Sequence, residues 1–239
     1  MVGVCKVTDC LGIDAVDEFE IETILVGAIA PLGRRRMLSA INKKPVMGRV
    51  RIGFLGIEGD EQADPSVHGG LDKAIHHYPT DHYAYWQQRY GQLPVLRDAG
   101  AFGENIAVYG IDESEASIGD VYRLGTALVE ISQGRQPCWK QAERLGKSAV
   151  VTDMLESTRC GWYYRVLEEG HAEAGDRLVL VNRPLPQLRV ARVIRLLVGG
   201  KHATDPAAVR ALAGFVVLSE SWRKRAHNLS KNEPIPPFE

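Results

Sequence analysis

The residue best suited to chemistry in this chain is Cys138, in the stretch SQGRQPCWK. Arg135 and Lys140 flank it, and two nearby cations favour the thiolate, which is a stronger nucleophile and metal ligand than the thiol. The alternative is a buried structural cysteine, which behaves as a small apolar residue. Pro137 favours the first interpretation, because its fixed φ and missing N–H indicate a rigid loop after the strand predicted at 127–132.

A second stretch, GIEGDEQADPSVHGGLDKAIHHYP at 56–79, concentrates carboxylates and histidines around glycines. Paired glycines allow a backbone to approach a bound group closely. This composition could hold a divalent metal, yet its spacing matches no helical metal-binding pair such as HExxH, and a polar surface turn has the same composition. We expect His76, His77 and His82 to cap the following helix or to face solvent.

A third stretch, GRRRMLSAINKKPVMGRV at 33–50, is rich in arginine and lysine. Mobile cations on a loop can bind a phosphate, and Lys43 is one of them. A solvated surface loop has the same composition, and this stretch alone favours that simpler interpretation.

The elements that must position these residues are mainly short strands. Apolar and β-branched runs end repeatedly at Gly, Asp or Pro, and they predict strands near 21–30, 48–56, 104–110, 120–125, 127–132 and 176–181. Two helices are expected among them, at 80–90 with Thr80 as the N-cap and at 148–159. The regular spacing of short strands predicts a mainly β fold with some α-helix, namely a β-barrel with helices packed outside it.

The balance of basic and acidic residues changes near Pro184. Residues 1–185 carry 20 Lys and Arg against 26 Asp and Glu, whereas residues 186–231 carry 9 against 2. Apolar spacing in the basic part predicts three short helices, with Asp205 and Ser219 opening the second and third. The expected organisation is therefore an acidic extension at 1–23, a β-barrel domain at 24–184, a three-helix module at 185–231 and a tail at 232–239.

Composition narrows the class of protein. A chain of 239 residues, 45% hydrophobic and 25% charged, can bury a substantial core. The four cysteines are too scattered for a disulfide framework and include no CxxC pair. The N-terminus is acidic where a secretory signal is basic, and no apolar run approaches the roughly 20 residues of a membrane helix. We expect a cytoplasmic protein without membrane contact, and the sequence leaves the oligomeric state open, a homodimer included.

Taken together and in order, these stretches resemble one family, the MOSC domain, which is named for the C-terminal domain of molybdenum cofactor sulfurase. The similarity lies in SAINKKPV, GIEGDEQADPSVHGGLDKAIHHYPTDHYAYW, AFGENIAVYGIDES, SIGDVYRLG and SQGRQPCWK. It is closest to the YiiM-like branch, which is linked to resistance to N-hydroxylated purines, and it runs from about Ile24 to about Trp222. Residues 1–23 depart from the pattern, as does Leu71, which stands where a proline often follows HGG.

The resemblance implies a molybdenum cofactor, with Cys138 as the thiolate ligand of molybdenum and the pterin dithiolene supplying the remaining sulfurs. It implies that Lys43, Arg135 and Lys140 bind the phosphate of molybdopterin. It also implies a pocket whose other residues contact the pterin or the substrate: Asp60, His68, Asp72, Lys73, Asn105 and Gln133. The implied reaction is the two-electron reduction of a small N-hydroxylated base to its amine, assisted by a proton from an acid such as His68.

Electrons would come from a separate reductase, because the sequence has no CxxxxCxxC set for an iron–sulfur cluster and no GxGxxG for a nicotinamide. Two other functions stay open. One is a carrier of sulfur or of molybdenum cofactor, in which Cys138 holds the cargo without turnover. The other is nucleic-acid binding through Arg223, Lys224 and Arg225, which the lack of an aromatic or Asn/Gln reading face disfavours.

Overall fold

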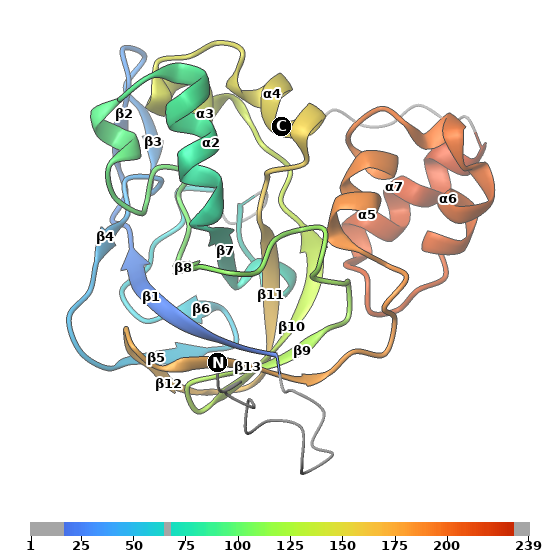
Figure 1. Ribbon diagram of the computed structural model, residues 1–239, viewed down its shortest axis with the longest axis horizontal. Helices are drawn as coiled ribbons and strands as arrows, with labels where there is room; N and C mark the ends of the chain where they lie inside the picture. The colour runs from blue at the N-terminus through green and yellow to red at the C-terminus, as the bar shows by residue number, and fades with distance from the viewer. Residues whose placement is uncertain (1–16, 65–67, 232–239) are drawn as a thin grey trace, which may run out of the picture.

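The chain folds around a closed β-barrel (Figure 1). The computed structural model describes residues 17–64 and 68–231. Seven strands form the ring, in the spatial order β1, β13, β9, β10, β11, β7, β8 and back to β1, and all neighbours are antiparallel except β7 and β8. Their bounds are β1 Glu18–Val26, β7 Ile75–Pro79, β8 Ile106–Val108, β9 Val121–Leu124, β10 Ala127–Gly134, β11 Trp162–Glu168 and β13 Arg177–Asn182. The predicted β-barrel is confirmed.

Strand β1 closes the barrel, and it begins at Glu18, whereas the sequence predicts a strand from residue 21 and the barrel domain from residue 24. Residues 18–20 pair with residues 177–179 of β13, and the following residues pair with β8. Glu18, Glu20 and Glu22 are exposed while Phe19 and Ile21 between them are half-buried and buried, because alternate residues of a strand face opposite sides. The register shifts after Ile21, and Ile24 is buried as well. The predicted acidic extension is therefore part of the barrel from Glu18 onward, and residues 1–16 lie outside the described residues.

Smaller sheets surround the ring. Strand β4 (Lys44–Pro45) extends β1, and β2 (Ala30–Leu32) pairs with β3 (Met37–Ser39) in a hairpin. The hairpin turn contacts helix α3 (Trp139–Leu145), since the Arg34 N–H donates to Glu143 at 2.9 Å. A three-stranded sheet contains β12 (Gly170–Ala172), β5 (Val50–Gly53) and β6 (Gly56–Ile57).

Helices α2 (Asp81–Tyr90) and α4 (Val150–Ser157) confirm the two predicted outside the barrel, whereas α3 was not predicted. Tyr83 and Trp86 of α2 are buried, but the side chain of Thr80 makes no capping hydrogen bond. Helix α4 ends ahead of the predicted residue 159, because Thr158 adopts a left-handed φ of 60°. Three short 3-10 turns complete the description: η2 (Leu71–Lys73), η3 (Pro94–Leu96) and η4 (His202–Thr204).

The three predicted C-terminal helices are present as α5 (Val190–Leu197), α6 (Pro206–Leu212) and α7 (Glu220–Lys231), and they form the lobe to the right of the barrel in Figure 1. Asp205 caps α6 by accepting the Ala208 N–H at 3.0 Å. Ser219 opens α7 and accepts the Trp222 N–H at 3.3 Å. The predicted tail at 232–239 lies outside the described residues.

Gly134, the last residue of β10, sets how closely these helices approach the barrel. A Cβ added there would lie 2.5 Å from Ile194 of α5, shorter than real Cβ contacts, and 3.0 Å from Trp222 of α7, tighter than most of them. Both side chains belong to the same buried core cluster as the barrel residues. The helices therefore pack directly onto the end of β10, next to the stretch that carries Cys138.

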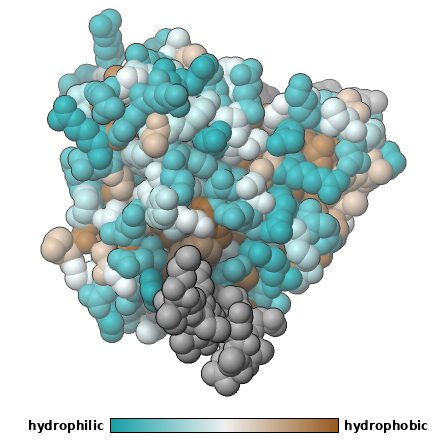
Figure 2. All heavy atoms as spheres, viewed as in Figure 1, coloured by the Kyte–Doolittle hydropathy of each residue, from teal (hydrophilic) through white to brown (hydrophobic). Residues whose placement is uncertain are grey.

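The face of the molecule seen in Figure 1 carries no large apolar area among the described residues. Figure 2 shows hydrophilic residues over most of that face, with small hydrophobic areas between them. Of the helices in the described part of the chain, none is long and apolar enough to cross a membrane.

Candidate active site

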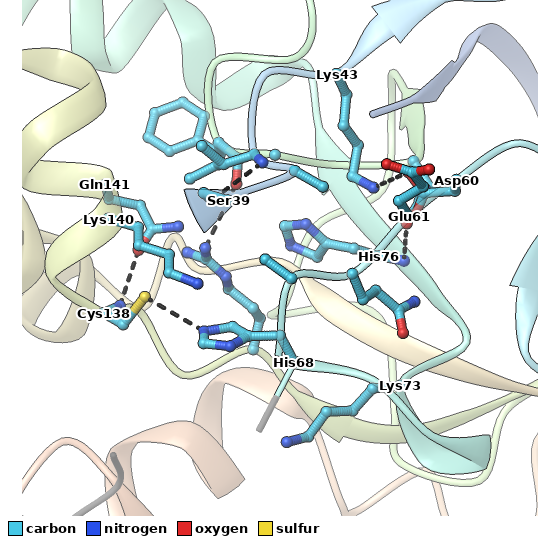
Figure 3. Close-up of a pocket in the computed structure, with 18 of the residues that line it drawn as sticks. Ser39, Lys43, Asp60, Glu61, His68, Lys73, His76, Cys138, Lys140 and Gln141 are labelled. Carbon is cyan, nitrogen blue, oxygen red and sulfur yellow. Dashed lines mark hydrogen bonds and ion pairs between the residues drawn. The ribbon is translucent and has the colours of Figure 1, made fainter. Parts of the chain in front are cut away.

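Cys138 lies between the end of β10 and the start of α3, in the loop that the sequence predicts. Its N–H donates to the side chain of Gln141 at 2.8 Å, and its carbonyl accepts the Gln141 N–H at 3.1 Å, so the backbone on both sides of the thiol is fixed. The side chain is half-buried. Its Sγ lies 3.7 Å from Nε2 of His68, as Figure 3 shows.

A cavity of about 70 Å³ adjoins this thiol and is lined by residues from distant parts of the chain. Eight of the predicted site residues line it: Lys43, Asp60, His68, Lys73, Asn105, Arg135, Cys138 and Lys140. They come from the loops before β4 and β7, from the start of β8 and from the segment that follows β10. The fold thus brings these residues together, and their individual roles stay predictions.

The end of the cavity near Cys138 is strongly cationic. Burial, followed by the positive charges of Lys140, Arg135 and Lys73, lowers the pKa of His68 to about 4. His68 is therefore a neutral imidazole at neutral pH. The predicted role of His68 as a charged proton donor does not fit this state; its geometry suits a hydrogen-bond partner of the Cys138 sulfur.

The opposite end of the cavity is held by a buried ion pair (Figure 3). The ammonium of Lys43 contacts Asp60, and the two side chains are 8% and 3% exposed. Asp60 also accepts the Gly27 N–H at 2.8 Å and the Asn105 amide at 2.9 Å. Since the charge of Lys43 is already neutralised, the structure favours a structural role for it over the predicted contact to phosphate.

Two predicted site residues do not line this cavity. Asp72 points to the outside of the barrel, where its carboxylate forms an ion pair with Arg165 at 2.8 Å. Gln133 is buried in β10, its carbonyl oxygen 3.4 Å from the hydroxyl of Ser221, and it lines a neighbouring cavity instead. The resemblance located both residues near the site but did not show which way they point.

His76 and His77 of β7 and His82 of α2 do not occupy the predicted surface positions. His76 and His77 are 2% and 0% exposed, and His82 is 4% exposed with Nε2 2.6 Å from Glu113, so none of them faces solvent. Burial lowers the pKa of His76 and of His77 well below 6.5, which keeps both neutral. His76 lines the cavity and was missed as a site residue, because a strand buried on both faces gives no alternating pattern.

Several buried polar atoms at the cavity have no hydrogen-bond partner among the described residues. These atoms are Nδ1 of His68, Nε2 of His76, Nη1 of Arg135 and Nε2 of Gln141. Buried polar groups are nearly always hydrogen-bonded in native proteins, so unpaired ones in a cavity indicate a ligand or ordered water. These polar atoms, the surrounding cations and the soft sulfur of Cys138 fit an anionic cofactor whose metal accepts sulfur.

A larger cavity of about 700 Å³ opens on the other side of Cys138. It shares Cys138, His68, Lys73, Lys140 and Tyr163 with the smaller cavity. Its remaining wall comes from the β2–β3 hairpin, from Asp64, from Gln133 of β10, from the loop that precedes α3 with Trp139, and from the start of α7. The thiol thus lies where a narrow polar cavity meets a roomy one.

The basic residues of α7 are engaged with the protein itself. Lys224 forms an ion pair with Glu220, and the guanidinium of Arg225 donates to the Leu197 carbonyl of α5. Arg223 donates to the Leu218 carbonyl at 3.1 Å. These contacts disfavour the nucleic-acid interpretation, because the three cations do not form a free phosphate-binding face.

The structure is a closed β-barrel with a half-buried cysteine at a cavity lined by lysine and arginine side chains. The family model of the MOSC domain matches residues 64–179. YflK of Bacillus subtilis is 37% identical over 205 residues, which cover 86% of this chain and 90% of YflK. The chain belongs to the MOSC domain family.

Within that family the likeness to YiiM proteins is close. The crystal structure of YiiM from Geobacillus stearothermophilus superposes with a TM-score of 0.75 and 35% identity, over 89% of this chain and 99% of that one. YiiM of Escherichia coli is 42% identical over 145 residues, which cover 61% of this chain and 65% of that protein. A protein named "Reductase" from Gibberella moniliformis is 39% identical over 161 residues, 66% of this chain and 28% of that longer protein.

Proposed function

We propose that this chain binds molybdenum cofactor through Cys138 and reduces N-hydroxylated bases or related N-oxygenated compounds to amines. The observation that carries the proposal is the half-buried thiol 3.7 Å from His68, whose pKa is lowered to about 4 by burial and then by the nearby cations of the cavity. A site lined by several cations favours an anionic ligand. The MOSC family membership and the relative named "Reductase" support a redox function.

Each side chain has a task that follows from its position. Cys138 would hold the metal, Arg135 and Lys140 would neutralise the phosphate, and His68 would keep a hydrogen bond to the sulfur. Lys73 borders both cavities and adds to the positive field. When bound, the cofactor supplies the two-electron redox chemistry that no protein side chain here provides.

The overall reaction would consume two electrons and two protons for each N–O bond broken, and would release one amine and one water. A separate reductase would deliver the electrons. The protein's contribution is to exclude bulk water around the thiol and to hold the substrate's N–O group next to it.

The test is the molybdenum and pterin content of protein produced in a host that makes the cofactor. Wild type should carry both, and Cys138→Ala should lose molybdenum while keeping its fold, because the thiol is half-buried and packs little. Cys160→Ala is the control, since Cys160 is a fully buried thiol that does not line the cavity. Equal molybdenum in wild type and Cys138→Ala would refute the assignment. Bound cofactor without turnover, with a reductase supplied, would favour the carrier function.

A further inference from the structure

The side-chain amide of Gln141 is buried beside the thiol, and the protein uses only one of its two polar atoms. Gln141 lies on the first turn of α3 and is 0% exposed. Its oxygen accepts the Cys138 N–H at 2.8 Å, whereas its nitrogen has no hydrogen-bond partner among the residues the structure describes. Buried polar groups are nearly always paired in native proteins, so this NH2 group indicates an acceptor supplied by a ligand or by ordered water.

The direction of the amide follows from this hydrogen bond. The Cys138 N–H can only donate, so the amide atom that faces it must be the oxygen. The nitrogen of the same amide then lies within about 5 Å of the Cys138 nitrogen, given the 2.8 Å bond and the width of an amide group. Figure 3 shows the oxygen of Gln141 joined to Cys138 and its nitrogen turned into the pocket. A ligand held at the thiol therefore lies close to this donor.

The groups around the amide nitrogen favour a negatively charged acceptor. Lys140 and Arg135 line the same cavity, and Nη1 of Arg135 is also buried without a partner among the described residues. The two carboxylates that line the cavity, Asp60 and Glu61, already accept hydrogen bonds from backbone N–H groups. Donors that converge beside cations bind most strongly to an oxygen that carries negative charge.

We propose that Gln141 is a binding residue of this site: its amide nitrogen donates to a negatively charged oxygen of the group held beside Cys138, while its amide oxygen fixes the Cys138 backbone. One side chain thereby links the position of the thiol to the presence of the ligand. The ligand chemistry is that of an oxyanion, such as phosphate or molybdate. The inference rests on the proposed function for the identity of the natural ligand, but recognition of a charged oxygen is measurable without the cofactor.

The test is calorimetric titration of cofactor-free protein with inorganic phosphate and, separately, with molybdate. Gln141→Glu keeps an oxygen for the Cys138 N–H, because Glu and Gln both bond back to the first residue from this helix position. It replaces the amide donor by an acceptor. The variant should melt as wild type does and bind an oxyanion roughly tenfold to a hundredfold more weakly, the range for loss of a hydrogen bond to a charged group. Weakening for one anion alone identifies the oxyanion that the site recognises.

Gln62→Glu is the matched control, because it adds the same charge to the same cavity from a half-buried residue. It should weaken binding clearly less than Gln141→Glu does. Equal weakening would overturn the proposal, since charge alone would then explain the loss. Unchanged affinity in Gln141→Glu, or a wild type that binds neither anion, would overturn it as well.

Nuclear magnetic resonance gives a readout in the wild-type protein that a purely structural amide would not move. The side-chain NH2 signals of Gln141, identified by their absence from Gln141→Met, should shift as the recognised anion is added. Gln141→Met should also lower Tm by at least about 2 °C, because it leaves the buried Cys138 N–H unpaired. NH2 signals that stay in place while the anion binds would contradict the donor role.

Molybdenum content separates the failure of this inference from the failure of the proposed function. Oxyanion binding that depends on Gln141, in a protein that carries no molybdenum when it is made in a cofactor-producing host, would refute the proposed function and support this inference. Molybdenum-loaded wild type whose cofactor-free form binds oxyanions equally well with glutamate at position 141 would do the reverse.

Discussion

Replacing Lys43 by methionine should destabilise the fold and leave cofactor binding intact. Burial lowers the pKa of Lys43, while the contact with Asp60 raises it, so the ammonium depends on that carboxylate. The variant therefore tests whether Lys43 is a structural residue, as the ion pair indicates, or a phosphate ligand, as the sequence predicts.

The magnitude follows from what the substitution leaves behind. Removing one member of a buried ion pair leaves the other charge uncompensated, which costs about 3–5 kcal/mol. Asp60 keeps its bonds from Gly27 and Asn105, so we expect the lower end of that range, about 3 kcal/mol. In a chain of this length, such a loss corresponds to a fall of about 6–12 °C in Tm.

The assay is thermal and urea unfolding of wild type, Lys43→Met, Asp60→Asn and the double variant. The double variant should lose less stability than the sum of the two single variants, because it leaves no charge unpaired. Lys44→Met is the matched control: Lys44 is exposed in β4, and the change should cost less than about 0.5 kcal/mol. A Lys43→Met protein with wild-type Tm but without molybdenum and pterin would refute the structural role and return Lys43 to the phosphate.

Three further predictions concern residues that support the site or the fold. Gly134→Ala should cost about 1–3 kcal/mol by overpacking Ile194 and Trp222, whereas Gly53→Ala, whose methyl would meet chiefly the end of a flexible glutamate, should cost clearly less in the same melts. Glu113→Ala removes the acceptor of the Cys160 and Gly161 N–H groups; it should cost at least about 2 kcal/mol and lower molybdenum retention, because the Gly161 carbonyl holds the Arg135 N–H at 2.9 Å. Unchanged melts would contradict either assignment. The hydrogen bond from Arg89 lowers the pKa of Asp153 from its ordinary 3.8, so the stability difference between wild type and Asp153→Asn should be constant above about pH 5 and shrink as pH falls below 3.8. A difference that does not change between pH 3 and pH 7 would contradict the last prediction.

The barrel could be predicted because its strands are locally marked. Residues 120–125 and 127–132 alternate and end at turn residues, and they appear as β9 and β10. The alternation of EFEIE at 18–22 is equally clear, with Phe19 and Ile21 less exposed than the glutamates on either side of them. The acidic charge of this stretch predicted an extension outside the barrel. Its alternation of polar and apolar residues indicates a strand instead, and in the structure that strand closes the barrel.

Strand β7 could not be identified from its own residues. Its five residues are all buried, so they show no alternation, and two histidines are unusual in a barrel core. What stabilises them lies far along the chain: the His77 ring stacks on Trp162 with centroids 4.0 Å apart and lies 3.1 Å from the hydroxyl of Tyr164. Such burial depends on tertiary partners, which local patterns do not contain.

The sequence predicted residues that meet at one cavity, but it did not predict how their side chains are arranged there. The resemblance to MOSC sequences selected residues that do line the cavity, although they come from separate segments. It could not show that Lys43 is neutralised by Asp60, that Asp72 faces outward to Arg165, or that His68 is neutral. Those facts depend on side-chain directions and on burial, which a motif does not specify.

The pairing of β1 with β13 affects how the barrel can form while the chain is being synthesised. One edge of β1 can pair only after residues 177–179 of β13 have been synthesised. This edge therefore stays unpaired until the other strands of the ring have been made. During that time its backbone N–H and C=O groups form an open edge that could pair with another nascent chain. The outward glutamates Glu18, Glu20 and Glu22 place like charges along that edge, which would discourage two such strands from pairing until the correct one arrives.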